Sequence, residues 1–289
     1  MSKLISFLLA CLLLNLSTQL QAEPIPPYTV DTKGEGAPIY FIPGLASPGE
    51  VWDELAAEVR ELGFQSRVLT LAGFAGSAPM NGDEFLPIVH RQLAAELAGL
   101  DQPAIVVGHS LGAFLALWLG TSSSEHLAGI VAVDGVPYLG ALADANATPE
   151  SNRTSAEQMA AFMASLSPEQ YAAQNRMALT GMITDPAAVE RIAETSGRSD
   201  PATVGRAVAE MLTMDLRPTM DRVKVPVVLI QAADSGAVEG VRESYAAQVE
   251  AIADLRHVVA TRGRHFVQTD DPEFVLAEIN RLLERLDRE

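Results

Sequence analysis

The chain has 289 residues, of which 48% are hydrophobic, so it can bury one large core or two ordinary ones. Its 20 Lys and Arg residues stand against 37 Asp and Glu residues, which gives a formal net charge of −17. Such a charge repels phosphate backbones and argues against general nucleic-acid binding.

The first 22 residues have the pattern of a secretory signal peptide. Lys3 supplies a positive start, an apolar stretch runs from Leu4 to Leu16, and Ala22 ends a plausible cleavage site. The apolar stretch spans about 13 residues, whereas a membrane-spanning helix needs roughly 20, so we expect no membrane span in the mature chain. We expect export to the periplasm or the medium with cleavage after Ala22, and a lipoprotein acylated at Cys11 is the alternative.

Cys11 is the only cysteine in the chain. After cleavage the mature chain would contain no cysteine, so its core must be stable without a disulfide. A cysteine nucleophile and thiolate metal ligands are excluded as well. We expect no metal and no cofactor.

Short apolar runs typical of strands alternate along the chain with segments whose apolar residues recur every three or four positions, as in helices. The runs typical of strands are residues 38–42, 66–71, 104–107, 129–133, 225–230 and 255–261. The helical segments are residues 50–62, 84–100, 111–120, 239–251 and 272–286. This alternation predicts a mostly parallel sheet with helices on both faces.

The alternation stops between residues 138 and 220, a stretch rich in Ala, Met and Gln without β-branched runs. Ser167, Asp185 and Asp200 each precede a proline, which is typical of a helix N-cap followed by proline in the first turn. The sequence therefore predicts an all-helical insertion at 138–220 within an α/β core formed by 23–137 and 221–289.

The segment Gly108-His109-Ser110-Leu111-Gly112 lies between an expected strand and an expected helix. A strand, a sharp turn with a central serine, and a helix form a nucleophile elbow, in which the serine is held in a strained backbone conformation. Larger side chains two positions before or after the serine would collide with neighbouring backbone. Ser110 is therefore the candidate nucleophile.

A serine hydroxyl needs a base, and the base needs an acid to orient it. His265 follows the last expected strand, at the edge where parallel sheets bind ligands, and is the candidate base. His109 is expected to pack away from the pocket. Asp234 and Asp134 both follow strands, and we favour Asp234 because its strand neighbours the one that leads to His265.

Two backbone N–H groups are candidates for an oxyanion hole, which would stabilise negative charge on the substrate oxygen. Leu111 directly follows the serine, and Leu45 lies in the loop after the expected strand 38–42. Gly44 would permit the sharp turn of this loop.

The order of these motifs resembles the α/β-hydrolase fold family. The resemblance rests on Ile42-Pro43-Gly44-Leu45, the Gly108–Gly112 motif, Asp234 and Gly263-Arg264-His265-Phe266, and it covers residues 28–286. It implies a mostly parallel eight-stranded sheet with the helical insertion as a cap over the pocket. In the family, the acid usually follows a glycine and two variable residues. Ala232-Ala233-Asp234 is one residue short of that spacing.

The resemblance implies a serine hydrolase that cleaves an ester or related acyl bond through an acyl-enzyme. Lactonases, aminopeptidases, C–C hydrolases and cofactor-free haloperoxidases share the same triad. A non-catalytic binding protein on this scaffold is the alternative of a different class. The partner would be a small molecule with an apolar acyl or alcohol group.

Seven of the nine methionines lie in the expected insertion. Methionine is flexible and suits irregular apolar surfaces, so these residues suggest an adaptable apolar pocket. Packing between the helices of the insertion is the alternative explanation. The seven residues are Met159, Met163, Met177, Met182, Met211, Met214 and Met220.

Overall fold

The computed structural model describes residues 25–233 and 241–288. The predicted signal peptide, Cys11 and Asp234 therefore lie outside the described residues. No helix in the described part of the chain is long and apolar enough to cross a membrane.

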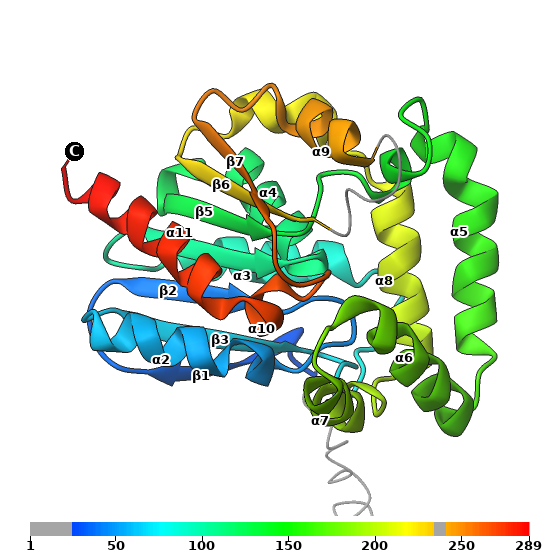
Figure 1. Cartoon of the computed structure of the whole chain (residues 1–289). Coiled ribbons are helices and arrows are strands. Elements are labelled where there is room, and N and C mark those ends of the chain that lie inside the picture. Colours follow the sequence, from blue (N-terminus) through cyan, green and yellow to red (C-terminus); the bar gives the residue numbers. More distant parts are fainter. Residues whose placement is uncertain (1–24, 234–240, 289) are drawn as a thin grey trace, which may run out of the picture.

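The core is an α/β sheet of seven strands with helices on both faces (Figure 1). The strand order is β1-β3-β2-β4-β5-β6-β7, and every neighbouring pair is parallel except β1 and β3. The predicted α/β class and the mostly parallel sheet are confirmed, whereas the described residues form seven strands instead of eight. The strands are β1 (Tyr28–Lys33), β2 (Pro38–Ile42), β3 (Gln65–Leu71), β4 (Ala104–His109), β5 (Leu127–Val133), β6 (Val227–Ala232) and β7 (Leu255–Ala260).

Two apolar layers hold helices against the sheet. Alternate residues of a strand point to opposite faces. The helices beside the sheet are α2 (Asp53–Glu61), α3 (Leu86–Ala98), α4 (Leu111–Ser122), α9 (Val241–Val249) and α11 (Pro272–Leu286), and the short α10 (Val267–Asp270) precedes α11. In β2, Tyr40 and Ile42 belong to the apolar layer that contains residues of α3, α4 and α9. Ile39 and Phe41 belong to the layer that contains residues of α2 and α11.

The segment between β5 and β6 is helical in the structure, as its sequence predicts. Its four α-helices lie beyond one end of the sheet (Figure 1), and the 3-10 helices Leu139–Leu142 and Arg217–Arg222 flank them in the sequence. The Ser167, Asp185 and Asp200 side chains each accept a hydrogen bond from a backbone N–H of the following first turn, so the three predicted N-caps are confirmed. The helices are α5 (Pro149–Ala164), α6 (Pro168–Met182), α7 (Pro186–Ser196) and α8 (Pro201–Thr213), and we call them the helical insertion.

Candidate active site

Ser110 lies at the junction of β4 and α4 with φ 52° and ψ −111°. Positive φ is rare for a residue with a side chain, and such strain persists only where the surroundings enforce it. Here the Ser110 N–H donates to the Val133 carbonyl at 2.8 Å, and the Ser110 carbonyl accepts from the Phe114 N–H at 3.0 Å. The turn therefore holds the Ser110 side chain at the wall of a cavity.

The glycines on both sides of Ser110 lie against backbone. A Cβ on Gly108 would lie 2.1 Å from the Gly112 carbonyl oxygen, and a Cβ on Gly112 would lie 2.1 Å from the Ile42 carbonyl oxygen. A change of side-chain rotamer cannot relieve either clash, because both opposing atoms belong to the main chain. The spacing of these glycines therefore follows from the close approach of β4, α4 and the end of β2.

His265 contacts Asp134. His265 Nδ1 lies 2.7 Å from Asp134 Oδ2, and the Asp134 side chain is fully buried, with 0% exposure, at the carboxyl end of β5. The Ala232 N–H donates to Asp134 Oδ1 at 2.9 Å and fixes the carboxylate. Because an ionised carboxylate only accepts, the proton of this pair lies on His265 Nδ1, and Nε2 is left as the basic nitrogen.

Of the two candidate acids, the structure pairs Asp134 with the histidine. Asp134 follows β5, which is the direct neighbour of β4, and His109 and Val133 are partners in the ladder between them. The acid and Ser110 therefore leave adjacent strands at the same level. Asp234, the acid favoured from the sequence, lies outside the described residues.

Residues with a strained backbone conformation cluster around the cavity that Ser110 lines. Four non-glycine residues in the described ranges 25–233 and 241–288 have a positive φ, and three of them are Ala46, Ser110 and Asp134. All three line the cavity. These three strained residues follow the carboxyl ends of β2, β4 and β5. Strained backbone of this kind often occurs at ligand-binding sites.

The loop that follows β2 and carries Leu45 begins next to the first turn of α4. Gly112 packs against the Ile42 and Pro43 carbonyls, so this loop and the first turn of α4 are in contact. Within the described residues, neither the Leu45 nor the Leu111 N–H has a hydrogen-bond acceptor. Leu45 lines the cavity, and Leu111 directly follows Ser110, which lines it as well.

His109 packs against the candidate base, contrary to the sequence-based expectation that it faces away from the pocket. Its ring centroid lies 4.6 Å from that of His265, and its Nε2 donates to the His265 carbonyl at 3.0 Å. Burial and the nearby His265 hold the pKa of His109 well below its usual value. His109 is therefore neutral, and it fills the space beside Gly44, where a Cβ would lie 2.7 Å from its Nδ1.

The loop that carries His265 is fastened to the helical insertion. Asp270 accepts hydrogen bonds from the Arg264 N–H at 2.8 Å and from the Thr184 N–H at 2.9 Å. The Phe266 N–H donates to the Met182 carbonyl at 3.1 Å. The position of His265 thus depends on the turn between α6 and α7 as well as on the sheet.

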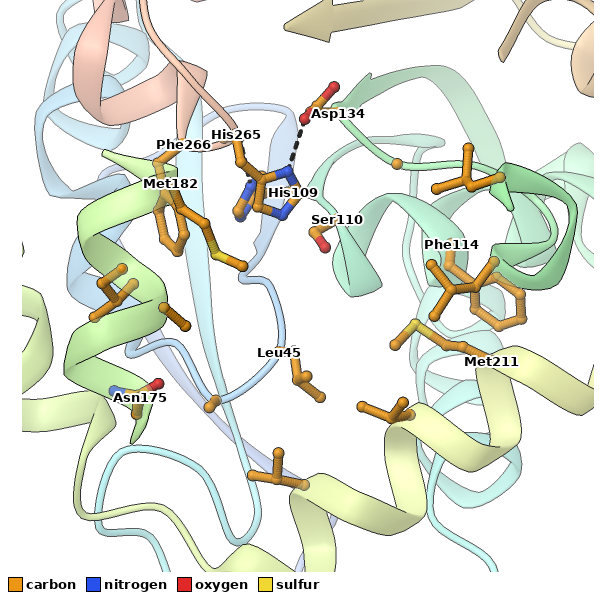
Figure 2. Close-up of a pocket in the computed structure, with 18 of the residues that line it drawn as sticks. Leu45, His109, Ser110, Phe114, Asp134, Asn175, Met182, Met211, His265 and Phe266 are labelled. Atoms are coloured by element: carbon orange, nitrogen blue, oxygen red, sulfur yellow. Dashed lines mark hydrogen bonds and ion pairs between the residues drawn. The ribbon is translucent and has the colours of Figure 1, made fainter. Parts of the chain in front are cut away.

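A cavity of about 430 Å³ extends from Ser110, His265 and Asp134 into the helical insertion (Figure 2). Its wall is mainly apolar, as is common in small-molecule sites. Asp134 is the only acidic side chain that lines it in the described part of the chain. The same residues contain no group of three or more His, Cys, Asp or Glu that could hold a metal ion.

Three of the seven methionines expected in the insertion line the cavity, namely Met163, Met182 and Met211. Met177 is 79% exposed and, like Met159, Met214 and Met220, does not line it, so the suggested role in an apolar pocket applies to three of the seven methionines. The spacing along α6 explains why Met182 lines the cavity and Met177 does not. Asn175, Leu179 and Met182 recur with the helical period and therefore share one face of α6. Met177 lies on another face.

The fold and the site define an α/β protein with a serine elbow at the carboxyl edge of a parallel sheet. A sequence profile described as the alpha/beta hydrolase family matches residues 39–278. The chain therefore belongs to the alpha/beta hydrolase family. No curated protein matches the sequence.

Solved structures with the same fold cover almost all of this chain. The enol-lactonase from Burkholderia xenovorans is 16% identical with a TM-score of 0.72, and the match covers 89% of this chain and 96% of that one. A thermophilic esterase from Thermogutta terrifontis is 19% identical with a TM-score of 0.72, over 90% and 93%. A bromoperoxidase from Bacillus anthracis is 17% identical with a TM-score of 0.73, over 89% and 95%. At such identities the likeness concerns the fold alone.

Proposed function

We propose that this protein is an exported serine hydrolase that cleaves a carboxylic ester, with Ser110, His265 and Asp134 as its catalytic triad. The observation that carries the proposal is the 2.7 Å contact between His265 Nδ1 and a fully buried Asp134, at the cavity that the strained Ser110 lines. A buried carboxylate on one ring nitrogen prepares the other nitrogen to accept a proton.

In the proposed reaction, Ser110 Oγ attacks the ester carbonyl carbon while His265 Nε2 accepts the hydroxyl proton. The Leu45 and Leu111 N–H groups donate to the oxyanion that forms. His265 then gives the proton to the leaving alcohol as the carbon–oxygen bond breaks, which leaves an acyl group on Ser110. Water, deprotonated by His265, attacks this acyl-enzyme and releases the acid.

Asp134 stabilises the imidazolium that forms in each step, without taking its proton. Its Oδ1 is already held by the Ala232 N–H, so the carboxylate does not have to reorient during the reaction. His109 supports the same arrangement through the His265 carbonyl.

Export is part of the proposal and rests on residues 1–22. Their positive start, short apolar stretch and ending at Ala22 are typical of a cleaved secretory signal. Fractionation of cells that express the full chain tests this point. We expect mature protein in the periplasm or medium that begins at Glu23, and a lipid-modified Cys11 at the amino terminus would contradict it.

The mainly apolar cavity wall favours a substrate with apolar groups on either side of the scissile bond over an aminoacyl amide with a charged ammonium group. Enol-lactonases, esterases and bromoperoxidases occur among the structures with this fold, so the fold does not choose between them. A panel of esters, lactones and aminoacyl amides, with kcat/KM measured for each, ranks these activities. We expect apolar esters to give the highest kcat/KM.

A fluorophosphonate probe tests the nucleophile directly. We expect covalent labelling of Ser110, and Ser110→Ala should abolish it while the variant keeps the wild-type circular dichroism spectrum. A folded wild-type protein that does not react would contradict the serine hydrolase and favour a non-catalytic binding protein.

A further inference from the structure

The cavity has two sides that differ in chemistry. Figure 2 shows Phe266, Met182 and Asn175 on the side of Ser110 where His265 lies, and Phe114 and Met211 on the opposite side. Helix α8, which carries Met211, contributes two more apolar residues to the wall, Val204 and Val208. Helix α6, which carries Met182 and Asn175, contributes the polar residues Gln174 and Asn175 to the wall.

The proposed triad chemistry assigns the two sides to the two halves of an ester. His265 must deliver its proton to the leaving oxygen, so the leaving alcohol lies on the His265 side of Ser110. The acyl chain then extends along the apolar side toward Met211. This assignment rests on the proposed function and on the positions in Figure 2.

The amide oxygen of Asn175 is available on the side of the cavity that we assign to the leaving alcohol. Its Nδ2 donates to Ser196 Oγ at 2.5 Å, and Ser196, at the end of α7, is itself buried. Within the described residues no donor reaches Asn175 Oδ1, and the amide lies at the cavity wall. The tether to Ser196 fixes the amide so that Oδ1 is the atom left to accept a hydrogen bond.

A hydroxyl matches this acceptor better than an ammonium group does. Desolvating a cation requires a negative partner, and the only carboxylate at the wall of the described cavity, Asp134, is engaged with His265. A neutral hydroxyl on an otherwise apolar alcohol needs only one acceptor. We propose that the substrates are esters of an apolar acid with an alcohol that carries a second, unesterified hydroxyl, which donates to Asn175 Oδ1.

A matched pair of esters tests the proposal. The probes are 4-hydroxybutyl hexanoate and pentyl hexanoate, which differ only by a hydroxyl in place of a terminal methyl. We expect the mature wild-type protein to prefer the hydroxyl ester by about fivefold in kcat/KM, the effect of one neutral hydrogen bond. Asn175→Leu, of similar size, should lose this preference, so that its ratio of kcat/KM for the two esters falls to about one.

Two further measurements separate recognition from a structural effect. Asn175→Asp keeps an acceptor oxygen and should retain a preference for the hydroxyl ester. Moving the hydroxyl to the acyl half, in pentyl 6-hydroxyhexanoate compared with pentyl heptanoate, should give a ratio that is the same in wild type and Asn175→Leu. A ratio that responds to Asn175 only with the acyl hydroxyl would overturn the assignment of the two sides.

The outcomes also distinguish this inference from the proposed function. Hydrolysis of both esters with an unchanged ratio in Asn175→Leu contradicts the role of Asn175 and leaves the serine hydrolase standing. Hydrolysis of neither ester, together with no fluorophosphonate labelling, contradicts both. A wild-type preference for the pentyl ester contradicts the hydroxyl-bearing alcohol.

Discussion

Asp134 combines full burial, a positive φ of 44° and a 2.7 Å contact with His265. We predict that Asp134→Asn lowers kcat/KM about a thousandfold or more, because an amide cannot stabilise the imidazolium and favours the wrong tautomer of His265. Steady-state kinetics on a soluble ester checks this prediction.

Asp234→Asn is the matched control for that experiment, since it makes the same chemical change at the acid that the sequence favours. We expect it to keep most of the wild-type kcat/KM. The assignment of Asp134 would fail if Asp234→Asn lost as much activity as Asp134→Asn. Thermal unfolding of both variants shows whether each one is folded.

The sequence alone could not determine which of the two aspartates pairs with His265. Both aspartates follow strands, and the sequence does not state which strands are neighbours in the sheet. The ladder between β4 and β5 is what places Asp134 beside the serine turn. Likewise, nothing in the sequence around His109 indicates that it contacts the His265 carbonyl, because the two residues are 156 positions apart.

At the scale of elements, the strand–turn–helix unit of β4 and α4 is built on backbone contacts. We predict that Gly112→Ala lowers the free energy of unfolding by about 1–3 kcal/mol or more, since its Cβ would meet the Ile42 carbonyl oxygen at 2.1 Å. Urea unfolding followed by circular dichroism measures this change.

Gly181→Ala is the control for Gly112→Ala. Gly181 is an exposed residue of α6 where an added Cβ would have no atom within 4 Å, so alanine should stabilise the protein by about 0.5–1 kcal/mol. Equal effects of the two substitutions would show that the contact between α4 and the end of β2 does not restrict residue 112.

Helix α8 forms the apolar side of the cavity through Met211 and its neighbours. We predict that Met211→Ala shifts the acyl preference to longer chains, with a gain of up to about fourfold in kcat/KM for each added methylene that fills the new space. Esters of one alcohol with graded acyl length measure the profile. Met177→Ala, at a residue that is 79% exposed, should leave the profile unchanged.

An identical profile in Met211→Ala and wild type would contradict an acyl site along α8. A shift in Met177→Ala of the same size would indicate an indirect effect on the insertion. Met177 and Met211 could not be separated in the sequence, because a run of methionines shows its helical face only once the helix is packed.

Most elements could be predicted because their apolar residues recur with the period of a helix or a strand. Strand β1 was missed, since its sequence YTVDTK contains one buried residue and four polar ones. It forms only through antiparallel pairing with β3, a long-range contact that local periodicity does not reveal. The helical insertion was predictable from its N-caps, whereas its residues at the cavity depend on how the helices pack.

At the scale of the whole molecule, buried neutral histidines link stability to pH. His90 is stacked on Trp118 with 4.0 Å between ring centroids, and its Nε2 contacts Ser122 Oγ. Burial lowers the pKa of His90 to about 4. The unfolded chain binds a proton near the ordinary value of about 6.5 whereas the folded chain does not, so the free energy of unfolding decreases as pH falls from there to about 4.

We predict that His90→Gln removes about 1–3 kcal/mol of this decrease between pH 7 and pH 4.5, because glutamine does not titrate. Urea unfolding at the two pH values measures the difference for each protein. His109, whose pKa is also lowered, continues to contribute, so the variant should keep part of the dependence. An unchanged dependence in His90→Gln would contradict the role of His90.

The hydrogen bonds of Asp270 to Thr184 and Arg264 connect two parts of the site. Asp270 binds both the loop of the candidate base and the turn after α6, while α6 itself forms the cavity wall that carries Asn175. The hydrogen bond from the Phe266 N–H to the Met182 carbonyl joins the same two parts, so the cavity wall and the candidate base are connected at more than one point. We expect that a ligand that displaces α6 also displaces His265 from Ser110, so that under the proposed function a bulky ester is turned over more slowly as well as bound more weakly.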